Sequence, residues 1–219
     1  MIDKNQVELS VVGKISDIGE QDWDACASNG YDGRQPEDPF VSYRFLKGLE
    51  DSKSVGAGTG WVPQYIIAKY DKKIIGVMPS FAKGHSQGEY IFDHNWAHAY
   101  ENAGGKYYPK LQISVPFTPV TGRRFLTISG YHDIAQSALL EGLKIIVSQQ
   151  KWSSAHITFC WGTHTCSPRI ELITILSGDP ECQTPSRRCP RVRIIKGATW
   201  APLVLQCSVA RSSEMVSRA

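Results

Sequence analysis

Residues 132–159 have the sequence HDIAQSALLEGLKIIVSQQKWSSAHITF, a helical pattern that runs directly into a strand pattern. Asp133 stands near the start, and apolar side chains then recur on one side of a helix, at Ile134, Ala138, Leu139, Leu143, Ile146 and Val147. The last six residues, SAHITF, are typical of a strand. A long helix that leads back into a strand predicts an α/β sheet with a parallel crossover.

The residues before this unit predict further strands and helices. YIIAKY at 65–70 and IIGVMPSFA at 74–82 are strand-like and flank a short polar turn, so we expect an antiparallel hairpin. An opening strand is expected within 7–18, a short helix over 21–28 that holds Trp23 inward, and a helix over 41–49. Together these patterns predict a mixed sheet with flanking helices, and the helix near 133–149 should pack on one face.

Composition excludes several classes of function. The chain has 219 residues, 42 % of them hydrophobic, and a net charge of only +3. Basic residues do not alternate with aromatic ones as they would in a nucleic-acid groove, so no DNA partner is expected, and charge gives no support for tRNA. Apolar runs fall short of the ~20 residues that cross a bilayer, and the N-terminus lacks the apolar core of a signal peptide. The expected compartment is the cytoplasm.

Chemistry-bearing residues concentrate between Gly88 and Arg124. This segment, GEYIFDHNWAHAYENAGGKYYPKLQISVPFTPVTGRR, combines two histidines, three acids, four tyrosines, a tryptophan and a terminal pair of arginines. Polar-tipped aromatic side chains, titratable groups and glycines are the usual constituents of a pocket wall. A ligand-binding pocket is therefore predicted here.

Long motifs in the same region carry a family resemblance. DPFVSYRFLKGLEDSKSVGAGTGWVPQYI, DHNWAHAY and YYPKLQISVPFTPVTG resemble the bacterial FemAB-like proteins of peptidoglycan biosynthesis and recognition, over about residues 7–159. The resemblance implies a GNAT-like fold, the N-terminal half of a tandem-GNAT protein, with Lys110–Phe117 as a central strand. It also implies an acyl donor, either acyl-CoA or aminoacyl-tRNA, and a small-molecule or peptidoglycan-precursor acceptor. The usual GNAT QxxGxG motif is missing, which leaves the donor open.

The resemblance also implies roles for particular residues. The loop after the central strand would receive the phosphates of the donor, and the donor-binding candidates are Lys110, Thr118, Thr121, Gly122, Arg123 and Arg124. Acyl transfer needs a base and an acid, for which the candidates are Glu89, Asp93, His94 and Tyr108, with Tyr107 as an alternative acid. We expect Glu89, Asp93, His94, Tyr108, Lys110 and Arg124 to line one concavity. The competing interpretation is that Asp93 caps a helix whose packed face carries Trp96 and Tyr100.

Metal binding is not expected. His94 and His98 have the i, i+4 spacing of a zinc pair, but HNWAH lacks the glutamate of the HExxH motif. A second candidate consists of Cys160, His164 and Cys166, with Cys182 and Cys189 further on, but it lacks a CxxC knuckle. No permanently bound cofactor is expected either.

The last sixty residues differ from the rest of the chain. Residues 1–159 carry 16 basic and 17 acidic residues, whereas residues 160–219 carry 8 basic and 4 acidic residues and five of the six cysteines. Because the family motifs stop at the same point, we interpret 160–219 as an irregular tail, the product of a frameshift or a small cysteine-rich module. This divides the chain into a GNAT-like domain over 1–159 and a tail that is disordered or non-native over 160–219, and it predicts that the truncated chain is poorly active.

The function expected from these observations is acyl or aminoacyl transfer to an amine, in cell-envelope metabolism. The alternative, from a different class, is a non-catalytic module that recognises a peptidoglycan-like or peptide ligand in the same pocket. Binding of acyl-CoA would separate the two, because a recognition module has no use for a donor.

Overall fold

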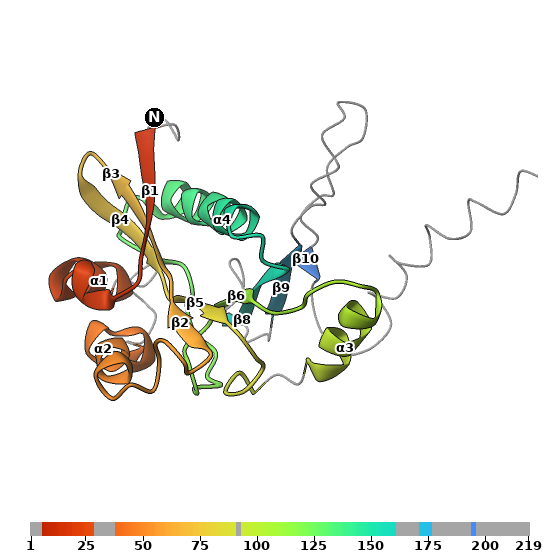
Figure 1. Ribbon diagram of the computed structural model, residues 1–219. Coiled ribbons are helices and arrows are strands. Elements are labelled where there is room, and N and C mark those ends of the chain that lie inside the picture. Colours follow the sequence, from red (N-terminus) through yellow and green to blue (C-terminus); the bar gives the residue numbers. More distant parts are fainter. Residues whose placement is uncertain (1–5, 29–37, 91–92, 161–170, 177–193, 196–219) are drawn as a thin grey trace, which may run out of the picture.

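The computed structural model describes residues 6–28, 38–90 and 93–160, together with the backbone of 171–176 and 194–195. It shows two β-sheets and flanking helices (Figure 1). The four-stranded sheet has the order β1 (Val7–Val12), β3 (Tyr65–Tyr70), β4 (Lys73–Met78) and β7 (Leu126–Thr127). The six-stranded sheet has the order β10 (Ile194–Ile195), β9 (Glu171–Leu176), β8 (Ser154–Cys160), β6 (Lys110–Ile113), β5 (Ser80–Lys83) and β2 (Trp61–Pro63).

Among the described residues, four α-helices and two short 3₁₀-helices accompany the sheets. The α-helices are α1 (Glu20–Ala27), α2 (Tyr43–Asp51), α3 (His94–Asn102) and α4 (His132–Gln149), and the 3₁₀-helices are Ile15–Asp17 and Pro39–Val41. The predicted mixed α/β fold with flanking helices is confirmed, whereas a GNAT-like topology stays a prediction. In the part of the chain that the structure describes, no helix is long and apolar enough to cross a membrane.

The predicted crossover is present. Strands β6 and β8 pair in parallel, with Leu111 opposite Ala155 and Ile113 opposite Ile157, and α4 lies between them in the chain. Every other strand pair in both sheets is antiparallel. The central strand expected over 110–117 is shorter than predicted, because β6 ends at Ile113 and Phe117 adopts a φ of 58°.

The predicted hairpin is confirmed in its first part and wrong in its second. Strands β3 and β4 pair around Asp71 and Lys72, which both have positive φ as a tight hairpin turn requires. The strand expected over 74–82, however, divides at Pro79 into β4 and β5, which belong to different sheets. Proline has no N–H to donate to a ladder, so it ends the pairing and lets the chain change sheets.

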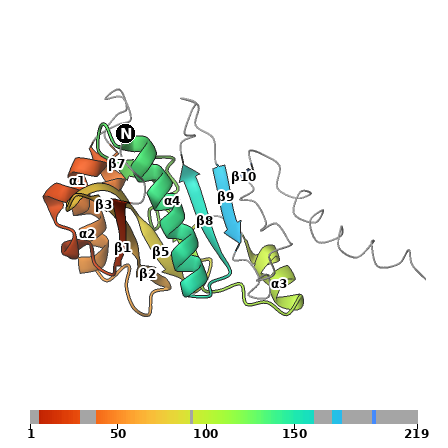
Figure 2. The ribbon, with the colours of Figure 1, turned by 90° about the horizontal axis from the view of Figure 1, so that it is seen from above.

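Helix α4 covers one face of the four-stranded sheet. Its buried residues are Ala135, Leu139, Gly142, Leu143, Ile146 and Val147, which closely follow the predicted apolar side. The helix lies against β1, β3, β4 and β8, and Figure 2 shows it running along the sheets. A Cβ on Gly76 of β4 would lie only 3.1 Å from the Cβ of Ala135, so glycine permits the close approach.

Helices α1 and α2 lie on the opposite side of the four-stranded sheet from α4 (Figures 1 and 2). Trp23 of α1 is completely buried, as predicted, and its Nε1 donates a hydrogen bond to the carbonyl of Val41 at 2.7 Å. The helix expected over 41–49 is present as α2, in which Leu46 is buried while Phe45 and Leu49 are partly buried against the core. Both sheets thus contribute to a continuous apolar core, and buried polar side chains gather on β5, β6 and β8.

Candidate functional site

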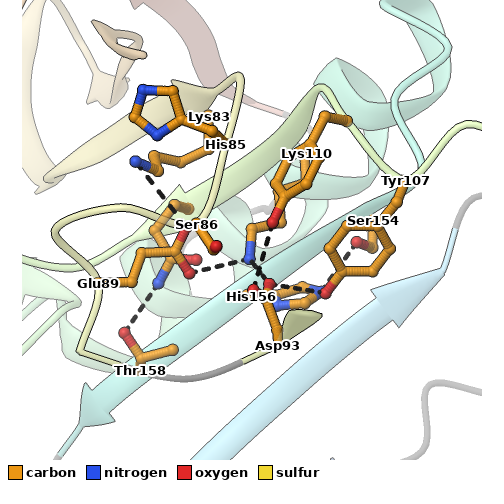
Figure 3. Close-up of polar contacts among 12 residues, drawn as sticks. Lys83, His85, Ser86, Glu89, Asp93, Tyr107, Lys110, Ser154, His156 and Thr158 are labelled. Carbon is orange, nitrogen blue, oxygen red and sulfur yellow. Dashed lines mark hydrogen bonds and ion pairs between the residues drawn. The ribbon is translucent and has the colours of Figure 1, made fainter. Parts of the chain in front are cut away.

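Lys110 is the centre of a buried cluster of charges at the start of β6. Its side chain is fully buried, and its Nζ lies 2.9 Å from Glu89 Oε2 and 2.5 Å from Asp93 Oδ2 (Figure 3). The rings of Tyr107 and Tyr108 flank the same ammonium, with centroids at 5.4 and 5.7 Å. One lysine therefore forms ion pairs with two carboxylates that come from the segment between β5 and α3.

Asp93 is held by more than the lysine. The Tyr107 hydroxyl donates to Asp93 Oδ2 at 2.9 Å, and the Tyr108 hydroxyl donates to Oδ1 at 3.2 Å. Asp93 occupies the N-cap position of α3, but its side chain makes no capping hydrogen bond. The predicted capping role is therefore wrong, because the carboxylate turns inward to Lys110 and the two tyrosines. The packed face predicted for this helix is wrong too, since Trp96 and Tyr100 are 37 % and 40 % exposed.

Glu89 connects Lys110 to a second buried lysine, Lys83. Residues Lys83 and Lys110 are register partners on β5 and β6, and Glu89 Oε1 lies 3.9 Å from Lys83 Nζ. Lys83 donates a hydrogen bond to the carbonyl of Gln87 at 2.8 Å and sits 3.8 Å above the ring of Trp61. Glu89 Oε1 itself has no hydrogen-bond partner among the described residues. Within the described cluster, this buried atom is the carboxylate oxygen that has no hydrogen bond.

Burial shifts the titration of these groups toward neutral pH. It raises the pKa of Glu89 to about 7, although Lys110 opposes the rise. Burial also lowers the pKa of Lys83 to about 8, against the pull of Glu89. For Asp93, burial acts to raise the pKa, but Lys110 and Tyr107 outweigh it and the pKa falls below its ordinary value. At pH 7 the cluster thus holds a firmly ionised Asp93 beside a Glu89 that can exchange a proton, the property required of a general base.

The tyrosines keep their protons. Burial, reinforced by Asp93, raises the pKa of Tyr107 far above its ordinary value. Burial also raises the pKa of Tyr108, and the hydrogen bond to Asp93 acts in the same direction. Both hydroxyls therefore serve as hydrogen-bond donors at neutral pH. Tyr108, predicted as an acid, is fixed on Asp93 in this arrangement.

His156 of β8 lies behind the cluster. Its ring packs edge-on against Tyr107 at 6.1 Å between centroids, and its Nε2 is 2.9 Å from Ser154 Oγ (Figure 3). Burial, followed by the nearby Lys110, lowers the pKa of His156 to about 3. The imidazole is therefore neutral at pH 7. It adds a polar, uncharged wall to the site.

The remaining catalytic candidate, His94, lies outside the buried cluster. It opens α3 on the surface, and its Nδ1 is 3.3 Å from Ser86 Oγ. The structure thus brings Glu89, Asp93, Tyr108 and Lys110 into one cluster and leaves His94 exposed at its margin. Their chemical roles stay predictions.

The donor-binding candidates other than Lys110 follow β6 in the chain, and most of them make hydrogen bonds to backbone carbonyls. Thr118 Oγ1 donates to the carbonyl of Pro116 at 3.1 Å, and Thr121 is half-buried. The amide of Gly122 donates to the carbonyl of Phe159 at 2.9 Å, and a Cβ on Gly122 would lie 2.2 Å from Asp38 Oδ2. This segment is therefore anchored to β8 on one side and close to Asp38 on the other.

The two arginines of this segment point into the protein. Arg123 donates to the carbonyl of Ala27, and the fully buried Arg124 donates to the carbonyls of Thr158 at 3.1 Å, Arg123 at 3.0 Å and Val120 at 2.8 Å. Burial lowers the pKa of both guanidinium groups. Arg124 lies apart from the Lys110 cluster in its contacts. A phosphate-binding role for Arg124 stays a prediction. It would require one of the N–H groups that now bond to backbone carbonyls to turn to the phosphate instead.

Metal ligands do not gather in the described ranges, where no group of three or more His, Cys, Asp or Glu side chains could hold an ion. His94 and His98 are both exposed on α3, and His98 Nδ1 is 3.1 Å from Asn102 Nδ2. Of the cysteine-rich candidate, Cys160 ends β8, while His164 and Cys166 lie outside the described residues.

Sequence reasoning missed Lys83 and His156. Both sit in strands, where a charged or titratable residue in an otherwise apolar run was the available signal. Lys83 is the last residue of SFAK, and His156 is the third of SAHITFC. A buried polar side chain requires a partner. For Lys83 the partners Gln87 and Glu89 are close in the chain. His156 contacts Ser154 two residues away and Tyr107 from a distant segment.

Comparison with known proteins places these residues in a wider group. A family model described as FemAB-like, peptidoglycan biosynthesis/recognition, matches residues 14–170. The match includes the whole charged cluster and runs past the boundary expected at 159, which stays a prediction. Strand β9, which lies in the expected tail, pairs antiparallel with β8, while most of 160–219 lies outside the described residues. No curated protein matches the chain.

Proposed function

The chain belongs to the FemAB-like family of peptidoglycan biosynthesis and recognition, and from this premise we propose that it transfers an acyl or aminoacyl group to an amine of a peptidoglycan-related acceptor. The observation that carries the proposal is Glu89. The residue is 4 % exposed, burial raises its pKa to about 7, and Oε1 has no hydrogen-bond partner in the described structure. A group with these properties can receive a proton from a bound ammonium at neutral pH.

The proposed step begins when the acceptor ammonium binds at Glu89 Oε1 and gives it a proton. The neutral amine attacks the acyl carbonyl and forms the N–C bond, and the ammonium groups of Lys83 and Lys110 stabilise the oxyanion. The intermediate collapses as the bond to the leaving group breaks, and that group takes the proton from Glu89. The new amide nitrogen releases its second proton to solvent, which completes the balance.

The remaining groups hold this carboxylate in place. Lys110 fixes Oε2, and Asp93 with its two tyrosine donors fixes Lys110. The donor is acyl-CoA or aminoacyl-tRNA in this proposal, and the loop at 118–124 is its proposed phosphate contact. Preorganised charges of this kind cost no rearrangement during the reaction.

The test is the Glu89→Gln variant, which keeps the shape of the side chain but cannot take a proton. We expect transfer to fall by about 10²–10⁴-fold, because the amide cannot take the proton of the bound ammonium. In the wild type the rate should rise with pH through about 7, since Glu89 must be ionised to act as base. Exposed Glu141→Gln on α4 is the matched control and should leave the rate unchanged. Equal rates for Glu89→Gln and wild type would refute the proposal.

The second candidate function is recognition without transfer, and the contacts of Asp93 favour it. Both oxygens of this carboxylate bond to side chains of the protein, as in an ion-pair network that has a structural role. A recognition module would bind the acceptor and show no affinity for either donor. Calorimetry with acyl-CoA and with aminoacyl-tRNA separates the two candidates.

A further inference from the structure

A polar stripe continues from the charged cluster across the six-stranded sheet. We define it by Lys110, Gln112 and Ser114 on β6 and just beyond, with Ser154, His156 and Thr158 on the adjacent β8. All six are at least nine-tenths buried. The alternating residues Leu111, Ile113, Ala155 and Ile157 belong instead to the hydrophobic core. Two neighbouring parallel strands thus have one apolar face and one polar face, although parallel strands buried on both faces are usually apolar throughout.

Two atoms of the stripe have unmet hydrogen-bonding capacity. Gln112 Nε2 donates to Thr158 Oγ1 at 2.8 Å, which orients the amide and leaves Oε1 as its other end. Gln112 Oε1 and Ser114 Oγ have no hydrogen-bond partner among the described residues. Gln112 is fully buried and Ser114 is 3 % exposed. Because buried polar groups are paired in native proteins, such atoms require a partner that the described residues do not supply, which can be ordered water or a bound ligand.

The chemistry of the open atoms defines that ligand. Gln112 Oε1 is an amide oxygen and can only accept hydrogen bonds. Glu89 Oε1 can likewise only accept when the carboxylate is ionised, and Ser114 Oγ can accept as well as donate. A ligand that satisfies all three must therefore offer several donors. Side chains two residues apart on a strand repeat at about 6.6 Å, and the N–H groups along one edge of an extended peptide repeat at the same interval.

We infer that the polar stripe binds an extended chain of amide groups, whose N–H groups donate to Gln112 Oε1 and Ser114 Oγ and whose terminal amine reaches Glu89. The inference rests on the proposed function only for the amine end. The stripe itself is a peptide-binding subsite whether or not transfer follows. Ser114 and Gln112 are then residues that determine acceptor specificity.

A saccharide is the competing ligand, because its hydroxyl groups can also donate. Its rings have no repeat that matches successive side chains of a strand. The test therefore compares two probes of known composition, trialanine and diacetylchitobiose, by isothermal titration calorimetry. It also compares the thermal unfolding midpoints of the variants without ligand.

Ser114→Ala is the main variant. If the Ser114 hydroxyl bonds to a ligand, its removal should weaken trialanine binding about tenfold. The thermal midpoint should stay unchanged or rise, because the substitution removes a buried hydroxyl that has no partner in the unliganded protein. Gln112→Met should weaken binding further, with a lower midpoint because Thr158 loses its donor. Ser148→Ala and Gln150→Met, at exposed positions near the end of α4, are the matched controls and should bind as wild type.

Four results would overturn the inference. Wild-type protein could fail to bind trialanine, or Ser114→Ala could bind it with unchanged affinity. Ser114→Ala could also lower the midpoint clearly, which would show that the hydroxyl has a structural role. Preferential binding of diacetylchitobiose would assign the stripe to a saccharide instead. Since these are binding measurements, failure of the transfer reaction alone would count against the proposed function and leave the subsite intact.

Discussion

Replacing Lys110 by methionine should destabilise the protein strongly at pH 8. Methionine fills a similar volume but removes the charge that lies 2.9 Å from Glu89 and 2.5 Å from Asp93. Both carboxylates would remain buried, with Lys83 the nearest cation at 3.9 Å from Glu89. Breaking a buried ion pair by removing one partner typically costs about 3–5 kcal/mol, so we expect a loss of that size in the free energy of unfolding.

The loss should depend on pH in a definite direction. Lys110 lowers the pKa of Glu89 and Asp93, so its removal raises both values. At pH 5 the carboxylates of the variant can take up protons, which removes their buried charge. Urea unfolding at pH 5 and pH 8 should therefore give a smaller loss at the lower pH. Adding Glu89→Gln to the variant should recover part of the loss at pH 8.

An exposed ion pair of the same length provides the control. Lys47 and Asp51 on α2 are also 2.5 Å apart, but their side chains are 38 % and 62 % exposed. Lys47→Met should change stability far less, because water screens an exposed pair. Equal losses in Lys47→Met and Lys110→Met, or a loss in Lys110→Met that does not change between pH 5 and pH 8, would refute the argument from burial.

Two further predictions concern neighbouring positions. His156→Gln should flatten the acid side of the stability profile: the pKa of His156 falls to about 3 on folding, so wild type loses stability as pH drops below 6.5, by at most ~1.4 kcal/mol per pH unit. Glu89, whose pKa rises to about 7 on folding, stabilises the protein as pH falls from about 7 to 4.5. The measurement is therefore the difference in the free energy of urea unfolding between wild type and His156→Gln at each pH. Parallel profiles of the two proteins would contradict the prediction. Gly122→Ala should lower stability by about 1–3 kcal/mol, because its Cβ would lie 2.2 Å from Asp38 Oδ2, whereas Gly48→Ala, with open space around it, should not. Equal thermal midpoints for the two alanine variants would count against that contact.

The fold could be predicted where local pattern was sufficient. The apolar periodicity of 132–149 is long, and α4 begins and ends within one residue of the range expected. The hairpin of β3 and β4 depends on a two-residue turn next to two apolar runs, which is also local information. The strand expected over 74–82 was wrong because Pro79 lies inside an apolar run, and the apolar pattern alone does not show that the chain changes sheets there.

The site could be predicted only in part, for a similar reason. Glu89, Asp93 and Lys110 lie within 21 positions of one another, so their density in the sequence drew attention to them. Lys83 and His156 enter the cluster through the pairing of β5 and β8 with β6, which depends on the whole fold. The inward turn of Asp93 followed from competition between a helix cap and a buried lysine, and the lysine offers the stronger, charge-assisted hydrogen bond.

The cost of the cluster is itself an argument for function. A buried ion pair is weak evidence for stability, since well-packed apolar side chains in its place are often neutral or better. Here Lys83, Glu89, Asp93 and Lys110 are buried together, and next to them Gln112 and Ser114 keep acceptors without partners in the described structure. Packing alone would favour apolar residues at these positions, as it does at Leu111 and Ile113 on the opposite face of the same strand segment. Sites that break the rules of packing without local compensation are expected where a ligand supplies what is missing. On this reasoning, the polar face of β6 lowers the stability of the free protein, and hydrogen bonds to a bound acceptor compensate for that loss.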